Sequence, residues 1–145
     1  MRVLIAGVAV LLSATAALAA PLPGVRTPTG NIRCFYVPIK PTQHGTLLCD
    51  LEHADFARVA QATCMARSGL DWHGFALPWN GRGELSCSGG VLYDIGRDHP
   101  RVRLLRYGTS WRYRGFTCTS RRRALSCVNG RGHGLLLSRQ EWRAW

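Results

Sequence analysis

The sequence predicts a mainly β fold, a small disulfide-stapled antiparallel sheet or barrel with one short helix near residues 55–66. Short apolar or alternating segments recur between glycines, prolines, asparagines and aspartates, as strands and their turns do. The length of 145 residues is that of a single domain. Six cysteines in so short a chain are typical of a small exported domain that supplements its core with disulfides.

The N-terminus has the parts of a secretory signal peptide. Arg2 is basic, residues 3–12 are apolar, and residues 17–19 form an A-x-A cleavage motif. We expect residues 1–19 to be removed and the protein to be secreted or to reside in the periplasm or cell envelope. The alternative is an uncleaved membrane anchor, since residues 3–20 are barely long enough to cross a bilayer. The sequence contains no second apolar stretch of that length, so we expect no stable transmembrane segment after cleavage.

Residues 20–30 follow the cleavage motif and contain three prolines and two glycines, which predicts a flexible N-terminal arm. We expect residues 31–145 to form one domain. Its helix is predicted by apolar residues at helical spacing, with Asp55 at the start and Gly69 beyond the end: Phe56, Val59, Ala60, Thr63 and Cys64. Short alternating segments predict strands at 83–87, 101–105, 110–118, 124–128 and 134–137.

In an oxidising compartment the cysteines predict three disulfides, for which 15 pairings are open. Two hairpins favour one pairing. If residues 121–124 form a four-residue loop, Cys118 lies opposite Cys127, and the segments 31–34 and 46–49 place Cys34 and Cys49 in a similar hairpin. By exclusion Cys64 pairs with Cys87. A zinc site is the alternative, which the absence of a C-x-x-C pair and the scatter of the histidines disfavour: His44, His53, His73, His99 and His133.

Several segments resemble the bacterial secreted domain-of-unknown-function family 6636. The most specific are YGTSW (107–111), GFTCTS (115–120), LSCVN (125–129), GHG (132–134) and LSR (137–139). TPTGNIRC (27–34), Cys64, Trp72 and Cys87 match it earlier in the chain. The resemblance implies a secreted, disulfide-linked, mainly β domain and implies no activity.

Positive charge is concentrated in the second half of the chain. The whole chain has 18 arginines and one lysine against 8 acidic residues, for a net charge of +11. Residues 20–98 sum to zero, whereas residues 99–140 contain ten arginines and no acid. Alternation predicts arginines on one strand face and apolar groups on the other, with three more at a hairpin tip. The candidate anion-binding residues are Arg101, Arg103, Arg112, Arg114, Arg121, Arg122 and Arg123.

Guanidinium groups suit bidentate contact with phosphate, sulfate or carboxylate, so an anionic polymer or acidic protein is the expected partner. The alternative is that arginine supplies surface charge alone, because net charge by itself argues for solubility and non-specific association. Nucleic acid is disfavoured because aromatic side chains that stack on bases would have to share the arginine face, whereas Trp111 and Tyr113 should point away from Arg112 and Arg114.

The remaining candidates are aromatic or catalytic. Trp72, Trp79, Trp142 and Trp145 suit either a sugar platform or, more often in a small domain, packing. His133, between two glycines, is the weak catalytic candidate, with Asp94 and Asp98 as partners by default. The glycines are explained equally well by a tight turn or bulge. We predict no metal and no cofactor.

Three functional hypotheses follow. The first is a non-enzymatic exported binding module whose arginines contact an anionic envelope or extracellular partner. The second is a small secreted hydrolase that uses His133. The third is a secreted inhibitor or protein-interaction module that projects the loop around residues 121–123.

Overall fold

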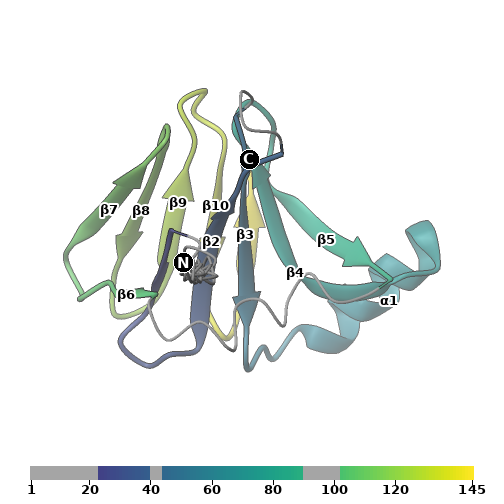
Figure 1. The fold of residues 1–145 in the computed structure, drawn as a ribbon. Coiled ribbons are helices and arrows are strands. Elements are labelled where there is room, and N and C mark those ends of the chain that lie inside the picture. Colours follow the sequence, from purple (N-terminus) through teal and green to yellow (C-terminus); the bar gives the residue numbers. More distant parts are fainter. Residues whose placement is uncertain (1–22, 40–43, 90–101) are drawn as a thin grey trace, which may run out of the picture.

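The computed structural model describes residues 23–39, 44–89 and 102–145. These residues form two open sheets and one short helix, which confirms the mainly β fold class (Figure 1). The predicted signal peptide, residues 1–19, lies outside the described residues. In the part of the chain that is described, no helix has the length and hydrophobicity needed to cross a membrane.

The N-terminal sheet has six strands in the order β5-β4-β3-β2-β1-β6. Neighbours from β1 to β5 run antiparallel, and β6 pairs parallel to β1 at the edge. The strands are β1 (Gly24–Arg26), β2 (Ile32–Val37), β3 (Thr46–Leu51), β4 (Asp71–Pro78), β5 (Glu84–Ser88) and β6 (Arg103–Leu104).

The C-terminal sheet is a meander in which every strand pairs antiparallel with the next. Its strands are β7 (Ser110–Tyr113), β8 (Phe116–Ser120), β9 (Leu125–Val128), β10 (Gly134–Leu137) and β11 (Trp142–Ala144). The single strand expected over residues 110–118 is wrong, because Arg114 and Gly115 form the turn between β7 and β8. Both have positive φ, 43° and 87°, as tight hairpin turns require. Arg114 therefore lies in a turn and does not share a strand face with Arg112.

The inner faces of the two sheets form one hydrophobic core. Tyr36 of β2 packs against Tyr113 and Phe116 of the C-terminal sheet, with ring centroids 5.1 and 6.0 Å apart. Phe75 of β4 packs against Trp142 of β11, with centroids 5.1 Å apart. Because these contacts join strands of different sheets, the sheets pack face to face as a sandwich.

Three disulfides, Cys34–Cys49, Cys64–Cys87 and Cys118–Cys127, have the pairing predicted from the sequence. The first and third join directly opposed residues of a hairpin, with Cα atoms 4.1 and 4.0 Å apart. They also meet in the core, where the Sγ atoms of Cys34, Cys49 and Cys127 lie within 4.8 Å of one another. All six sulfurs are disulfide-bonded, so this sulfur cluster offers no thiolate to a metal.

Helix α1 (Ala57–Ser68) confirms the predicted helix and lies beside β4 and β5 (Figure 1). Ala60 and Cys64, four residues apart, are buried against the sheet, and Cys64 is bonded to Cys87 of β5. Val59 was expected on the packed face, but it is 69% exposed. The helix therefore buries a narrower stripe than the sequence pattern implies.

Three strands were not expected: β1 and β11 near the ends of the chain, and β4 in its middle. Residues 24–26 belong to the predicted flexible arm, yet they form β1 between β2 and β6, and Val25 is fully buried. The proline-rich composition concealed a strand that pairs with β2 across a short turn and with β6 far along the chain. Strand β4 was missed because the register shifts between Trp72 and Phe75, which breaks the alternation and places both rings against Phe56. Strand β11, at the other end of the chain, was missed too.

Candidate anion-binding site

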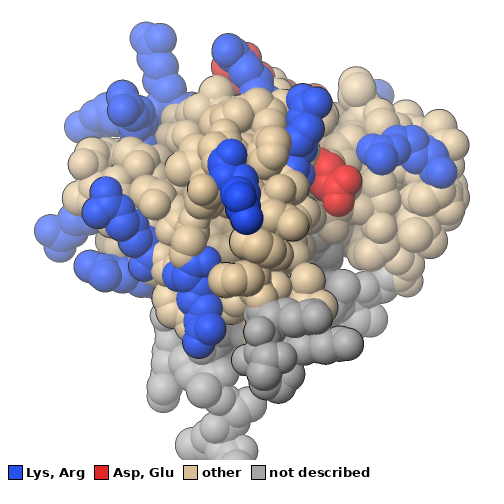
Figure 2. Space-filling model, turned by 90° about the horizontal axis from the view of Figure 1, so that it is seen from above, with Lys and Arg blue, Asp and Glu red and all other residues tan. Residues whose placement is uncertain are grey.

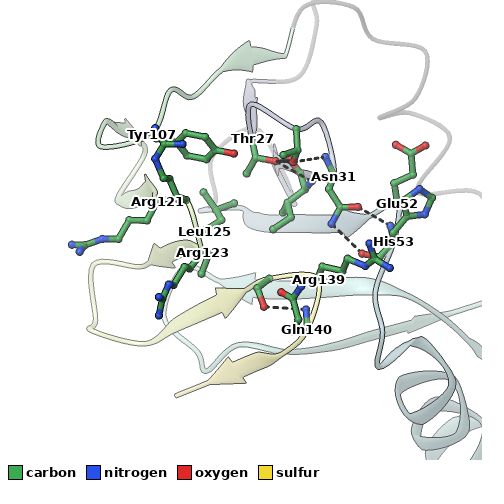
Figure 3. A pocket seen from close by; sticks show the side chains of 15 residues that line it. Thr27, Asn31, Glu52, His53, Tyr107, Arg121, Arg123, Leu125, Arg139 and Gln140 are labelled. Carbon is green, nitrogen blue, oxygen red and sulfur yellow. Dashed lines mark hydrogen bonds between the residues drawn. The ribbon is translucent and has the colours of Figure 1, made fainter.

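A cleft of about 500 Å³ lies at one end of the sandwich, where connecting segments from both sheets meet (Figure 3). One wall is the β8–β9 turn, residues 121–124, which we call the arginine loop. The other wall comes from the β1–β2 turn, the segment after β3 and the β10–β11 turn. Residues more than 80 positions apart in the chain therefore border the same cleft.

The arginine loop is a four-residue turn held by its strands, as the sequence predicts. Arg121 N–H donates to the Ala124 carbonyl at 2.9 Å, and Ser120 pairs with Leu125 immediately below. The Cys118–Cys127 disulfide lies two residues further from the tip on each strand. The hydrogen bond, the strand pairing and the disulfide hold the loop backbone in place, and the three arginine side chains extend from it.

All three side chains of the loop, Arg121, Arg122 and Arg123, are exposed. Among the residues that the structure describes, none of them forms an ion pair. The Cζ atom of Arg122 lies 5.4 Å from the centroid of the Tyr107 ring, a cation–π contact that orients one guanidinium beside the cleft. The loop thus presents three positive charges with no carboxylate partner in the described chain.

The opposite wall is fixed by side-chain hydrogen bonds. The Asn31 amide donates to the His53 carbonyl at 3.0 Å and accepts the His53 N–H at 2.8 Å, as Figure 3 shows. Arg139 projects from the β10–β11 turn, and its Nε lies 3.0 Å from Asp55 Oδ1. Among the described residues that line the cleft, Glu52 is the one carboxylate. Since Asp55 offsets Arg139, the arginine loop gives the cleft its net positive charge.

This arrangement suits capture of an extended anion. Each guanidinium donates a planar fork of N–H groups that fits carboxylate, sulfate or phosphate oxygens. A single exposed ion pair contributes little, on the order of 0–1 kcal/mol. Three neighbouring charges on a fixed loop therefore favour a polymer that engages them together, because contacts within one bound chain add without a new association step.

Three other predicted anion-binding residues, Arg103, Arg112 and Arg114, do not line this cleft. Arg103 is in β6, Arg112 is in β7, and Arg101 lies outside the described residues. Arg114 lies at the opposite end of the sandwich from the arginine loop. Figure 2, viewed from that opposite end, shows arginine or lysine side chains scattered over the surface with few acidic ones. The structure brings Arg121, Arg122 and Arg123 together and separates them from Arg103, Arg112 and Arg114.

The alternation expected at residues 101–105 holds only in part. Val102 and Leu105 are buried, whereas Leu104 is 40% exposed beside Arg103. Strand β6 is two residues long, so it does not present one charged and one apolar face. At β7 the expectation holds, because Trp111 is buried in the core while Arg112 is exposed.

His133 lies in the β9–β10 turn, and its backbone has a structural role. Its N–H donates to Asn129 Oδ1 at 3.1 Å, and its carbonyl accepts the Asn129 N–H at 2.9 Å. Asp94 and Asp98, the acids suggested as its partners, lie outside the described residues. Within the described residues, no hydrogen bond or ion pair links the His133 ring to a carboxylate. The turn explanation of the two glycines is the one that these contacts support.

All four candidate tryptophans contribute to packing, and Trp79 does so as a half-buried side chain against the hydrophobic core. Trp72 donates its indole N–H to the Gly74 carbonyl at 2.8 Å and packs on Phe75, and Trp142 also packs on Phe75. The ring of Trp145, 40% exposed, lies against Gly134. Trp79, beyond the end of β4, borders a second cleft.

Sequence reasoning missed most of the cleft outside the arginine loop. Glu52 and His53 carry no local motif, and the segments YGTSW and LSR that contain Tyr107 and Arg139 gave no sign of a shared cleft. These residues come from different turns that meet only in the folded chain. Asn129 was also missed as a structural residue. Its signal was available only through the family resemblance, in the segment LSCVN (125–129).

The fold and the cleft define a disulfide-linked β-sandwich with an arginine loop at one end. A family model described as a family of unknown function, DUF6636, matches residues 5–143, and the chain belongs to this family. No curated protein and no solved structure matches the chain. Its three disulfides indicate folding in an oxidising compartment. The family is described as one of unknown function, so membership assigns no function to the site.

Proposed function

We propose that this protein is an exported, non-enzymatic binding module whose arginine loop holds an anionic polymer of the cell envelope or the extracellular medium. The observation that carries the proposal is the group of three exposed guanidiniums, from Arg121, Arg122 and Arg123, that have no carboxylate partner among the described residues. Their fixed backbone and the adjacent cleft distinguish them from arginines dispersed over the surface.

Export is part of the proposal, and two features support it. The N-terminal sequence has the three parts of a signal peptide, and three disulfides are typical of chains that fold outside the cytosol. Binding is favoured over catalysis because the best catalytic candidate, His133, contributes its backbone to a turn.

The test uses heparin as a sulfated polysaccharide probe and measures its dissociation constant at increasing sodium chloride. The test variant replaces Arg121, Arg122 and Arg123 with Gln. We expect the wild-type affinity to fall steeply with salt, since exposed charges are screened within about 10 Å at 0.1 M. We expect the variant to bind at least about tenfold more weakly at low salt.

A matched control removes the same charge elsewhere. Arg58, Arg67 and Arg82 are exposed and lie away from the cleft, so replacing them with Gln lowers the net charge equally. We expect this control to retain most of the affinity. The proposal fails if wild-type protein does not bind heparin at low ionic strength, or if the control variant loses as much affinity as the loop variant.

A further inference from the structure

A second cleft, of about 430 Å³, lies at the end of the sandwich opposite the arginine loop. Its lining residues come from the start of β3, the end of β4, the β7–β8 turn and the β9–β10 turn. This volume is within the range of about 300–1,000 Å³ that is usual for small-molecule sites. The second cleft is smaller and more aromatic than the first.

An aromatic stack forms one side of this cleft. The Trp79 and His44 rings lie nearly parallel, with centroids 4.1 Å apart and an interplanar angle of 27°. The Cζ atom of Arg131 lies 5.6 Å from the Trp79 centroid. Trp79 therefore orients both an imidazole and a guanidinium. This packing leaves the indole half-buried, so it still presents apolar surface at the cleft.

Positively charged side chains also border this second cleft. Arg114 and Arg131 are exposed, and neither forms an ion pair with a residue that the structure describes. Between them, Gly115 and Gly130 line the cleft with backbone alone. No carboxylate is among the described residues that line it. The cleft thus combines an aromatic stack, two guanidiniums without an ion-pair partner among the described residues, and accessible peptide groups.

One buried side chain holds the walls in place. The Asn129 amide donates to the carbonyls of Pro78 and Gly81 at 2.7 and 2.9 Å, fixing the segment that carries Trp79. Its Oδ1 accepts the N–H of Arg131 at 3.0 Å. Asn129 is only 5% exposed, so these bonds are shielded from water. The cleft is organised before any ligand arrives, which lowers the entropic cost of binding.

We propose that this second cleft binds an acidic sugar unit, a pyranose carrying a carboxylate or a sulfate. The guanidiniums of Arg114 and Arg131 take the acid group, because planar N–H forks match its oxygens. The Trp79–His44 stack takes the apolar C–H face of the ring, as aromatic bodies do in binding pockets. A bare phosphate or sulfate ion has no apolar face, so it contacts the guanidiniums but not the Trp79–His44 stack.

The test titrates a galacturonic acid disaccharide into the ¹⁵N-labelled wild-type protein and follows the indole N–H resonance of Trp79. The Trp79→Phe variant assigns the resonance. We expect a saturable shift, and a similar one with a sulfated disaccharide of the chondroitin type if sulfate also serves as the acid group. A neutral galactose disaccharide and inorganic sulfate should each bind at least about tenfold more weakly.

Two variants locate the interaction. Replacing both Arg114 and Arg131 with Gln should weaken the disaccharide at least about tenfold, and both side chains are exposed, so the fold is retained. Replacing Arg121, Arg122 and Arg123 with Gln should leave the titration unchanged, which separates this site from the arginine loop. The proposal is overturned if the neutral disaccharide binds as tightly as the acidic ones, if no acidic disaccharide shifts the resonance, or if the Arg114 and Arg131 variant binds normally.

Discussion

The two sheets of this sandwich differ in how their strands are connected. The C-terminal sheet is built from consecutive hairpins with short turns, so each strand pairs with its sequence neighbour. The N-terminal sheet places α1 between β3 and β4 and pairs β1 with β6, more than 75 residues away. Local pairing leaves a pattern in the sequence, whereas a distant partner leaves none.

The sheets also differ in charge. The C-terminal sheet and its turns contain most of the arginines of the segment 99–140, whereas residues 20–98 are neutral overall. Both clefts nevertheless need both sheets, since the arginines come from C-terminal turns and the facing residues from N-terminal segments. The contact between the sheets therefore decides whether either cleft exists.

Reduction of the disulfides is expected to have the largest effect, because it affects both sheets at once. Each disulfide contributes on the order of 3 kcal/mol, against a typical total of about 5–15 kcal/mol. We expect the reduced protein to lose its near-UV circular dichroism. Retention of that signal after complete reduction would show that the hydrophobic core maintains the folded structure without the disulfides. Replacing both cysteines of Cys34–Cys49 with Ala, or both cysteines of Cys118–Cys127, tests the two sheets separately. We expect the two variants to lose similar amounts of unfolding free energy.

The Asn129→Ala substitution tests the link between the sheets. It removes the two donors that satisfy the Pro78 and Gly81 carbonyls and the acceptor for two N–H groups of the β9–β10 turn. We expect the free energy of unfolding to fall by about 2–4 kcal/mol, measured by denaturant titration. Asn80→Ala, at an exposed position of the neighbouring loop, is the control and should change it by less than about 0.5 kcal/mol. Equal effects of the two substitutions would contradict this role of Asn129.

The Val25→Ala substitution tests the strand that the sequence concealed. Val25 is fully buried in β1, so truncating it should cost about 1–3 kcal/mol of unfolding free energy. Val59→Ala makes the same chemical change at a position that is 69% exposed on α1, and should change stability by less than about 0.5 kcal/mol. If thermal or denaturant unfolding shows no difference between the two variants, β1 is not an integral part of the sheet.

Much of the covalent and local framework was predictable. The pairing of Cys118 with Cys127 followed from one four-residue turn, and the helix followed from apolar spacing. Strand β4 was not predictable, because the bulge at Gly74, with φ of 111°, breaks the period of two on which strand prediction depends. The arginine loop was found as a charge cluster, but nothing in the sequence indicated which residues face it across the cleft.

The sequence by itself determined the mainly β class, the disulfide pairing, the hairpins and the excess of arginine in the C-terminal half. These depend on side-chain period, turn composition and residue type, which act over a few positions of the chain. Only the tertiary structure decided that Val25 lies in a strand, that Asn129 joins the two sheets, and that Arg114 and Arg121 lie at opposite ends. These depend on contacts between distant segments, which form only when burial of the shared core brings the two sheets together.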